Sequence, residues 1–191
     1  MNNKKTLIIL VLALVVLIAG ASVLYRTLGQ TVAPEQLATQ EPTSSQEETE
    51  APLMQAPDFT VYDMDGKEVK LSDFFGKPIV VNFWASWCGP CKMEMPDFHE
   101  KYLEIGEEVT FLMVNMTDGD RETVEIASDF IAQQGYTFPV LYDTASSAAM
   151  TYGVYSLPTT FFIDADGNAV AQATGAIDAD TLQRGIDMIC A

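Results

Sequence analysis

The sequence predicts an α/β fold in which helices cover both faces of a mixed central sheet. Three observations lead to this fold class. Residues 78–85 are a short run rich in β-branched and aromatic residues, which is typical of a strand buried on both faces. The pair Asp65-Gly66 separates two strand-like runs, which predicts a β-hairpin. Strand-like and helix-like segments then alternate as a β-α-β unit followed by a β-β-α unit, so the sheet is mixed.

The elements are expected in the following order. The hairpin occupies 59–62 and 68–71, and the buried strand 78–85 comes next. Apolar residues at helical spacing predict a helix over about 91–105, and Pro90 fits its first turn, where a missing N–H costs nothing. The remaining elements are strand 109–115, helix 121–134, strand 138–142, a short helix near 145–152, strands 159–163 and 168–173, and a closing helix marked by Leu182, Ile186 and Ile189.

Two cysteines stand at the junction of the buried strand and the helix that follows it, in the segment Trp87-Cys88-Gly89-Pro90-Cys91-Lys92. Unpaired N–H groups and the helix dipole favour a thiolate at a helix N-terminus, where the pKa of a cysteine falls to about 3.5–7.5 from about 8.5. Cys88 is therefore the candidate nucleophile. Cys91, one turn inside the helix, is the candidate resolving cysteine that attacks a mixed disulfide at Cys88. The spacing predicts a redox-active Cys88–Cys91 disulfide.

Cysteines at this spacing also occur in zinc sites and in structural disulfides. A zinc site needs about four ligands, and outside the C-x-x-C pair the chain has only Cys190 and one histidine, His99, so we expect no metal and no cofactor. A purely structural disulfide stays open as an alternative, although closing so short a loop removes little chain entropy.

The segment Phe83-Trp84-Ala85-Ser86-Trp87-Cys88-Gly89-Pro90-Cys91-Lys92 resembles the active-site segment of the thioredoxin superfamily. Four earlier segments resemble the lead-in of the membrane-tethered TlpA/ResA-type thiol-disulfide oxidoreductases, which have a redoxin or AhpC/TSA-like domain: Ala56-Pro57-Asp58-Phe59-Thr60, Asp65-Gly66-Lys67, Leu71-Ser72-Asp73-Phe74 and Gly76-Lys77-Pro78. The resemblance covers about residues 56–190. It implies a thioredoxin-like fold with an N-terminal β-hairpin and a helix-containing insertion before a cis-proline loop.

The same resemblance implies a substrate-binding surface around the two cysteines. Leu157-Pro158-Thr159-Thr160 resembles the cis-proline loop, in which the residue before the proline pairs its backbone with an extended substrate. We therefore expect Leu157 and Pro158 to contact substrate. Trp87, Gly89 and Pro90 are further candidate substrate-binding residues, although a large aromatic residue at a strand end is as often a packing residue.

Proton handling is where the sequence departs from ordinary thioredoxin. Asn82 occupies the position at which thioredoxin proper has a buried aspartate. Glu94, three residues after Cys91, matches a glutamate of ResA-like proteins, and helical spacing puts it on the cysteine side. If it is partly buried, Glu94 has a raised pKa and is a candidate proton relay for Cys91. A solvated surface glutamate is the alternative.

The N-terminal part predicts a domain organisation and a location. Residues 1–5 carry two lysines and precede an almost uncharged run, 6–25, long enough to span a bilayer, which predicts a transmembrane signal anchor with the N-terminus in the cytoplasm. Residues 26–55 are predicted to be a disordered acidic linker, and 56–191 a thioredoxin-like domain. The expected location is the cell membrane, single-pass, with the domain outside. A cleaved signal peptide, and hence a secreted protein, is the alternative.

Charge and resemblance together indicate the function. A formal net charge of −17 argues against nucleic-acid binding. The resemblance implies an extracytoplasmic oxidoreductase that reduces disulfides in client proteins such as apocytochrome c and is itself reduced by a membrane electron donor of the CcdA/DsbD type. The protein is expected to be a monomer. Two alternatives stay open, namely a thiol peroxidase of the peroxiredoxin type and a non-catalytic binding module for unfolded cysteine-containing clients.

Overall fold

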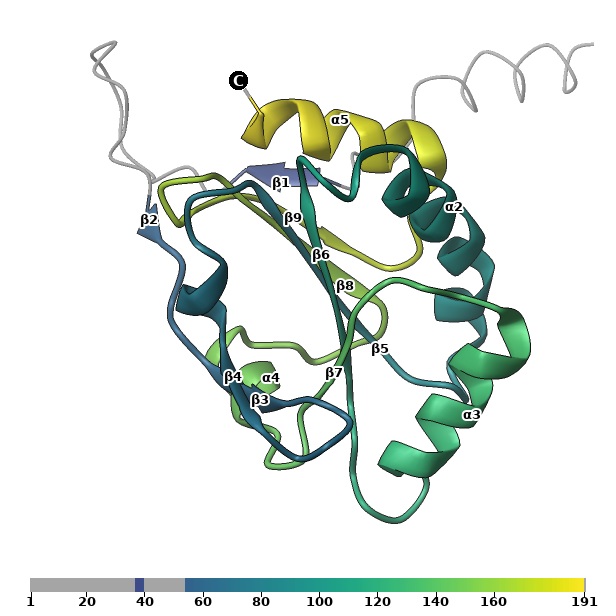
Figure 1. Cartoon of the computed structure of the whole chain (residues 1–191). Coiled ribbons are helices and arrows are strands. Elements are labelled where there is room, and N and C mark those ends of the chain that lie inside the picture. The colour runs from purple at the N-terminus through teal and green to yellow at the C-terminus, as the bar shows by residue number, and fades with distance from the viewer. Residues whose placement is uncertain (1–36, 40–53, 191) are drawn as a thin grey trace, which may run out of the picture. The chain divides into compact units, whose positions relative to one another are not determined.

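A computed structural model describes residues 37–39 and 54–190, and these residues contain one large mixed sheet with helices packed on it (Figure 1). The strands are β1 (Leu37–Thr39), β2 (Met54–Gln55), β3 (Thr60–Tyr62), β4 (Glu68–Lys70), β5 (Ile79–Trp84), β6 (Thr110–Asn115), β7 (Val140–Tyr142), β8 (Thr159–Ile163) and β9 (Asn168–Thr174). The helices are the 3-10 helix η1 (Leu71–Phe74) and the α-helices α2 (Gly89–Ile105), α3 (Val124–Gln134), α4 (Ser147–Thr151) and α5 (Ala179–Ile189).

Parallel strands form the centre of the sheet. The strand order is β1-β9-β8-β5-β6-β7-β3-β4, and β2 also pairs with β9. β5 runs parallel to β6, and β6 runs parallel to β7, whereas the other pairings are antiparallel. The predicted α/β class, hairpin and mixed sheet are therefore confirmed.

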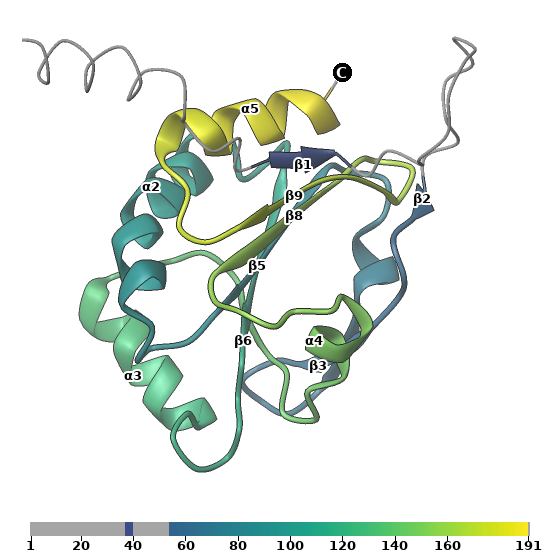
Figure 2. The same cartoon turned by 180° about the vertical axis from the view of Figure 1, so that it is seen from behind.

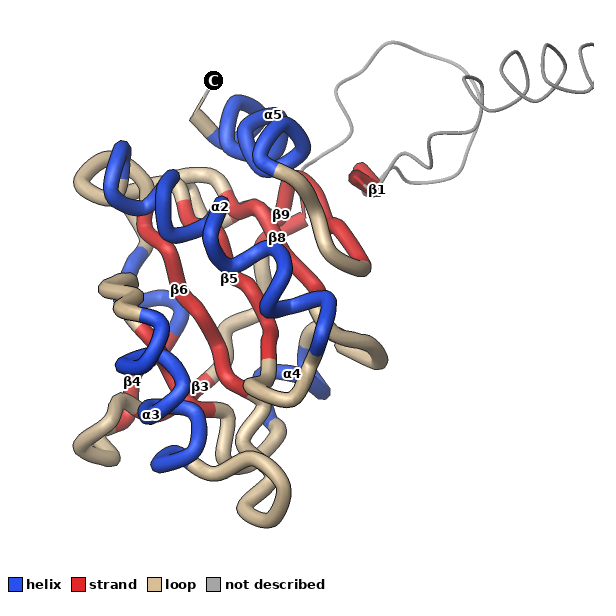
Figure 3. Tube along the Cα trace, turned by 90° about the vertical axis from the view of Figure 1, so that its right-hand side faces the viewer, coloured by secondary structure: helices blue, strands red, loops and turns tan. Residues whose placement is uncertain are grey.

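The two faces of the sheet bury separate apolar clusters. Side chains of β5 alternate, so that Val80 and Trp84 point to one face while Val81 and Phe83 point to the other. The first face packs against α2, α3 and α5, and the second against α4, η1 and the hairpin strand β3. Figure 3 shows α2 lying across the central strands on the first face. The helix that carries the cysteines is thus packed against the central strands of the sheet.

Two elements differ from their predicted bounds for local reasons. The helix predicted over 121–134 begins only at Val124, because a carboxylate oxygen of Asp118 accepts the N–H groups of Asp120 and Glu122 and holds them in a loop. Thr123 then caps the helix through its side-chain oxygen. Part of the predicted linker is also ordered as strand, since β1 and β2 both pair with β9 (Figure 2). The predicted domain bounds, 56–191 included, stay a prediction.

The predicted location needs correction. The predicted segments 1–5 and 6–25 lie outside the described residues. Among residues 37–39 and 54–190, no helix has the length and apolar character needed to cross a membrane. The longest helix there, α2, has 17 residues and includes charged side chains such as Lys92 and Glu94. The prediction of a single-pass protein of the cell membrane is withdrawn on this finding.

Candidate active site

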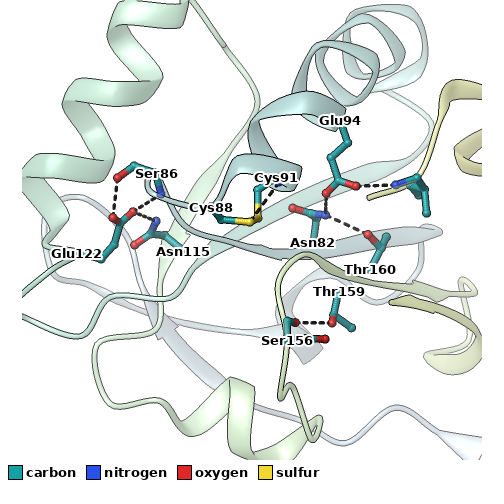
Figure 4. The surroundings of a disulfide bond; sticks show 11 residues. Asn82, Ser86, Cys88, Cys91, Glu94, Asn115, Glu122, Ser156, Thr159 and Thr160 are labelled. Carbon is teal, nitrogen blue, oxygen red and sulfur yellow. Dashed lines mark hydrogen bonds between the residues drawn. A yellow bond between two sulfur atoms is a disulfide. The ribbon is translucent and has the colours of Figure 1, made fainter. Parts of the chain in front are cut away.

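Cys88 and Cys91 form a disulfide at the start of α2, with an S–S distance of 2.05 Å (Figure 4). Cys88 is the N-cap residue of the helix, and its sulfur accepts the backbone N–H of Cys91 at 3.2 Å. Pro90 stands in the first turn, as predicted from the sequence. Both sulfur-bearing residues are buried, Cys91 completely and Cys88 with 4% of its surface exposed. The outer sulfur therefore lies at the positive end of the helix dipole.

Glu94 lies one turn after Cys91 on the buried face of α2 and is 2% exposed. Its carboxylate accepts two hydrogen bonds, one from the Asn82 side-chain nitrogen at 2.8 Å and one from the backbone N–H of Ile177 at 2.9 Å. Burial raises the pKa of the Glu94 carboxyl to about 7, the two hydrogen bonds oppose this rise, and the charge of Asp97 adds to it. Glu94 is thus a buried group that titrates near neutral pH.

Asn82 connects Glu94 to the neighbouring strand. The residue lies in β5 and is fully buried. Its Nδ2 donates to Glu94 and to Oγ1 of Thr160 on β8, the latter at 3.0 Å, whereas its Oδ1 has no hydrogen-bond partner. In Figure 4 the Asn82 oxygen is on the side that faces the disulfide, and the nitrogen is on the side of Glu94. From the sequence, Asn82 was noted only because it stands where thioredoxin has a buried aspartate, and no role was predicted for it.

A second buried glutamate, Glu122, holds the loop that leads to the disulfide, and the sequence analysis missed it. Its carboxylate accepts the backbone N–H of Ser86 at 2.7 Å, the Ser86 hydroxyl at 2.6 Å and the Asn115 side-chain nitrogen at 2.7 Å. Trp84 at the end of β5 pairs with Asn115 at the end of β6. Because both parallel strands end at the same sheet edge, a charged residue shortly after the second strand was the available signal.

Three of the predicted substrate-binding residues surround Cys88 at the surface. Trp87, Gly89 and Pro90 are exposed, and 42% of Trp87 is accessible. The guanidinium carbon of Arg121 lies 3.9 Å from the centroid of the Trp87 ring, which is a cation–π contact. Arg121 and Glu122 thus contact adjacent parts of the cysteine loop.

The other two predicted substrate-binding residues lie in the loop before β8. The peptide bond between Leu157 and Pro158 is cis, as the resemblance implied. Pro158 is buried, and its carbonyl oxygen accepts the N–H of Gly175 at 2.9 Å. Leu157 is half-buried and packs against the apolar cluster that contains Cys88 and Cys91. The loop therefore borders the disulfide region.

The remaining cysteine and the histidine take no part in this site. Cys190 is free and exposed at the end of α5. Partial desolvation of the sulfur and the charge of Asp187 raise the pKa of its thiol, which makes Cys190 less reactive. His99 interacts with Thr137, at 3.1 Å from its hydroxyl.

A disulfide at the start of a helix on a mixed sheet defines a thioredoxin-like redox protein, and comparison with known proteins leads to the same class. The AhpC/TSA family profile matches residues 52–172. The structure is similar to that of a putative thiol:disulfide interchange protein DsbE from Chlorobium tepidum, with a TM-score of 0.65, 32% identity, and coverage of 73% of this chain and 97% of that chain. It is also similar to the exposed lipoprotein thioredoxin Etrx1 of Streptococcus pneumoniae, with a TM-score of 0.58, 35% identity, and coverage of 69% and 98%. The fold is thioredoxin-like.

Sequence similarity narrows the class further. The chain is 38% identical over 138 residues to the thiol-disulfide oxidoreductase ResA of Bacillus thuringiensis subsp. konkukian, which covers 71% of this chain and 76% of the relative. The chain belongs to the AhpC/TSA family and, within it, to the ResA-type thiol-disulfide oxidoreductases. It is therefore an enzyme of thiol-disulfide exchange that acts on disulfide-containing proteins.

Proposed function

We propose that this oxidoreductase reduces disulfides in client proteins, with Cys88 as the nucleophile and Cys91 as the resolving cysteine. The asymmetry of the pair carries the proposal. Cys88 caps α2, and the N–H of Cys91 is directed at its sulfur, whereas Cys91 lies completely buried behind it. Backbone N–H groups and the helix dipole stabilise a thiolate at Cys88, and a thiolate is the attacking species in exchange.

The reaction has two steps in which the bonds and electrons balance. The Cys88 thiolate attacks one sulfur of the client disulfide, forms a mixed disulfide and releases the first client thiolate, which takes up a proton. Cys91 then loses its proton, attacks the Cys88 sulfur and releases the second client thiolate, which also takes up a proton. The client disulfide gains two electrons and two protons, and the protein is left with its Cys88–Cys91 disulfide.

Glu94 is proposed as the acceptor of the Cys91 proton. It is buried one turn from Cys91, and its pKa of about 7 lets the carboxyl accept and release a proton near neutral pH. Glu94→Gln keeps the shape but cannot take up a proton. We expect this variant to slow the release of the second client thiolate several-fold, with little change in the formation of the mixed disulfide. Equal rates for both steps in the two proteins would remove Glu94 from the mechanism.

The client is proposed to bind across the exposed surface beside Cys88. Trp87, Gly89 and Pro90 border the outer sulfur on one side, and Leu157 of the cis-proline loop offers its backbone on the other. Apocytochrome c is the proposed client, because its cysteines must be reduced before haem attaches. A dithiol protein of the CcdA/DsbD type is the proposed electron donor, and a monomer suffices for this cycle.

The direction of electron flow decides between a reductase and an oxidant. A reduction potential of the Cys88–Cys91 pair below about −220 mV supports a reductase, whereas a value near −120 mV contradicts it. Reduced Cys91→Ala should trap a disulfide-containing client, or insulin with its disulfides intact, as a mixed disulfide at Cys88, and Cys88→Ser should trap none. Undiminished client binding by Cys88→Ser, without turnover by the wild type, would support a binding module instead.

A further inference from the structure

The carboxamide oxygen of Asn82 is a buried acceptor for which the disulfide form provides no donor. Asn82 is fully buried, both hydrogen bonds of its side chain use Nδ2, and Oδ1 has no partner. Buried polar atoms in proteins are almost always hydrogen-bonded, so an unpaired one indicates strain or a role in another state of the protein. The other state available to this site is the reduced dithiol.

The orientation of the Asn82 amide follows from its neighbours. The Glu94 carboxylate accepts at Oε1 from Asn82 and at Oε2 from the N–H of Ile177. With the Glu94 carboxyl ionised, exchanging the two ends of the amide would bring the Asn82 oxygen against Glu94 Oε1, so that two acceptors would face each other. The nitrogen therefore faces Glu94 and Thr160, and the oxygen faces the opposite side.

The opposite side is occupied by the disulfide. Asn82 alternates along β5 with Val80 and Trp84, which belong to the cluster that contains Cys88 and Cys91, so its side chain leaves the same face of the strand. Glu94 and Cys91 are one turn apart on the helix above this face. Figure 4 shows the Asn82 oxygen directed toward the sulfur atoms.

We propose that Asn82 is the positioning residue for Cys91, because its Oδ1 accepts the S–H of Cys91 in the dithiol state and so favours the reduced form of the pair. Reduction by two glutathione thiols transfers two electrons and two protons to the disulfide and yields one glutathione disulfide. The sulfur of Cys91, which has no hydrogen in the disulfide, then becomes a donor. A thiol that donates a hydrogen bond is stabilised in its protonated form, which also leaves the ionised sulfur at Cys88. This inference rests on the proposed redox cycle.

The equilibrium of the full chain with glutathione tests this assignment. Asn82→Leu removes the acceptor and keeps a similar volume. Because it removes a hydrogen bond of the dithiol and the unpaired oxygen of the disulfide form, we expect it to favour the disulfide about tenfold, or about 30 mV toward a more negative potential. Thr160→Val is the matched control, since it removes the other Nδ2 partner but leaves the Asn82 oxygen in place. An unchanged constant in Asn82→Leu, or an equal shift in both variants, overturns the proposal.

A second measurement covers the case in which Asn82→Leu fails to fold or alters Glu94. In a Cys88→Ser and Cys190→Ser background, Cys91 has the chain's remaining thiol, and its S–H stretching band can be read by infrared spectroscopy. Adding Asn82→Ala should move this band to higher frequency, because a hydrogen-bonded S–H vibrates at lower frequency. An unmoved band overturns the proposal. Both measurements need no client, so failure to reduce insulin would count against the proposed function alone.

Discussion

Two buried glutamates flank the disulfide, and they differ in how their carboxylates are held (Figure 4). Glu122, on the side of the loop before Cys88, accepts three hydrogen bonds from Ser86 and Asn115. Glu94, on the side of Cys91, accepts two, and one of them comes from an asparagine whose oxygen is unpaired. The three hydrogen bonds of Glu122 hold the cysteine loop in place, so its carboxylate is a structural clamp. Burial raises the pKa of the Glu94 carboxyl to about 7, so Glu94 can take up a proton near neutral pH. The same residue type thus has two roles at one site.

Removing the Glu122 carboxylate should have the largest effect on the free energy of unfolding. Glu122→Ala leaves the Ser86 N–H, the Ser86 hydroxyl and the Asn115 amide without their acceptor, so we expect the free energy of unfolding to fall by about 4 kcal/mol. Urea denaturation of the oxidised protein measures this loss. Glu125→Ala, an exposed glutamate at the start of α3, is the control and should cost under about 0.5 kcal/mol. Equal losses in the two variants would show that the hydrogen bonds of Glu122 stabilise the protein no more than an exposed glutamate does.

The contribution of Glu94 to the free energy of unfolding should depend on pH. Its folded pKa of about 7 is above that of an unfolded glutamate, so the folded protein binds the extra proton between about pH 4.5 and 7. The stability that this proton contributes is complete below that window and is lost as the pH rises through it. The wild type should therefore lose about 3 kcal/mol relative to Glu94→Gln between pH 4.5 and pH 8.

Urea unfolding of both proteins at several pH values measures this difference. Glu104→Gln, on the same helix but exposed to solvent, serves as the control for the loss of one carboxylate from this helix. A difference between wild type and Glu94→Gln that stays constant from pH 4.5 to 8 would mean that Glu94 does not take up a proton in this range.

The smallest effect on the free energy of unfolding is expected from the contact between Arg121 and Trp87, at the surface beside Glu122. Arg121→Ala removes the cation–π contact with Trp87, which is worth about 0.5–1 kcal/mol at an exposed position. A double-mutant cycle of Arg121→Ala with Trp87→Ala, read by urea unfolding, isolates this term from the separate effects of the two residues. A coupling energy of zero would show that the contact between Arg121 and Trp87 adds no stability to this loop.

The parts of the site that lie close together in sequence were predictable. The strand, the C-x-x-C pair, the first turn of α2 and Glu94 fall within residues 79–94, where local periodicity and capping rules apply. The bonds that decide the chemistry join distant residues. Ile177 is 83 positions from Glu94, and Glu122 is 36 positions from Ser86. Such contacts depend on how strands end and loops turn, and no local pattern encodes them.

The start of α3 illustrates the same limit. Helix propensity alone would let the helix begin at 121, but side-chain bonds from Asp118 compete with the helical hydrogen bonds over the next few residues. Glu122 is thereby kept out of the helix, and its carboxylate reaches the cysteine loop. The predicted start of α3 at residue 121 was therefore wrong, and Glu122, which the sequence did not indicate as a site residue, lies in the part that is not helical.

The pairing of β1 and β2 with β9 has a consequence for the solubility of shortened chains. An uncovered strand edge offers a row of unpaired N–H and C=O groups on which a second molecule can add. Residues 37–39 and 54–55 occupy that edge here. A chain that began at residue 56 would keep its redox residues but would leave the outer side of β9 bare, and it would self-associate through strand addition more readily than the longer chain.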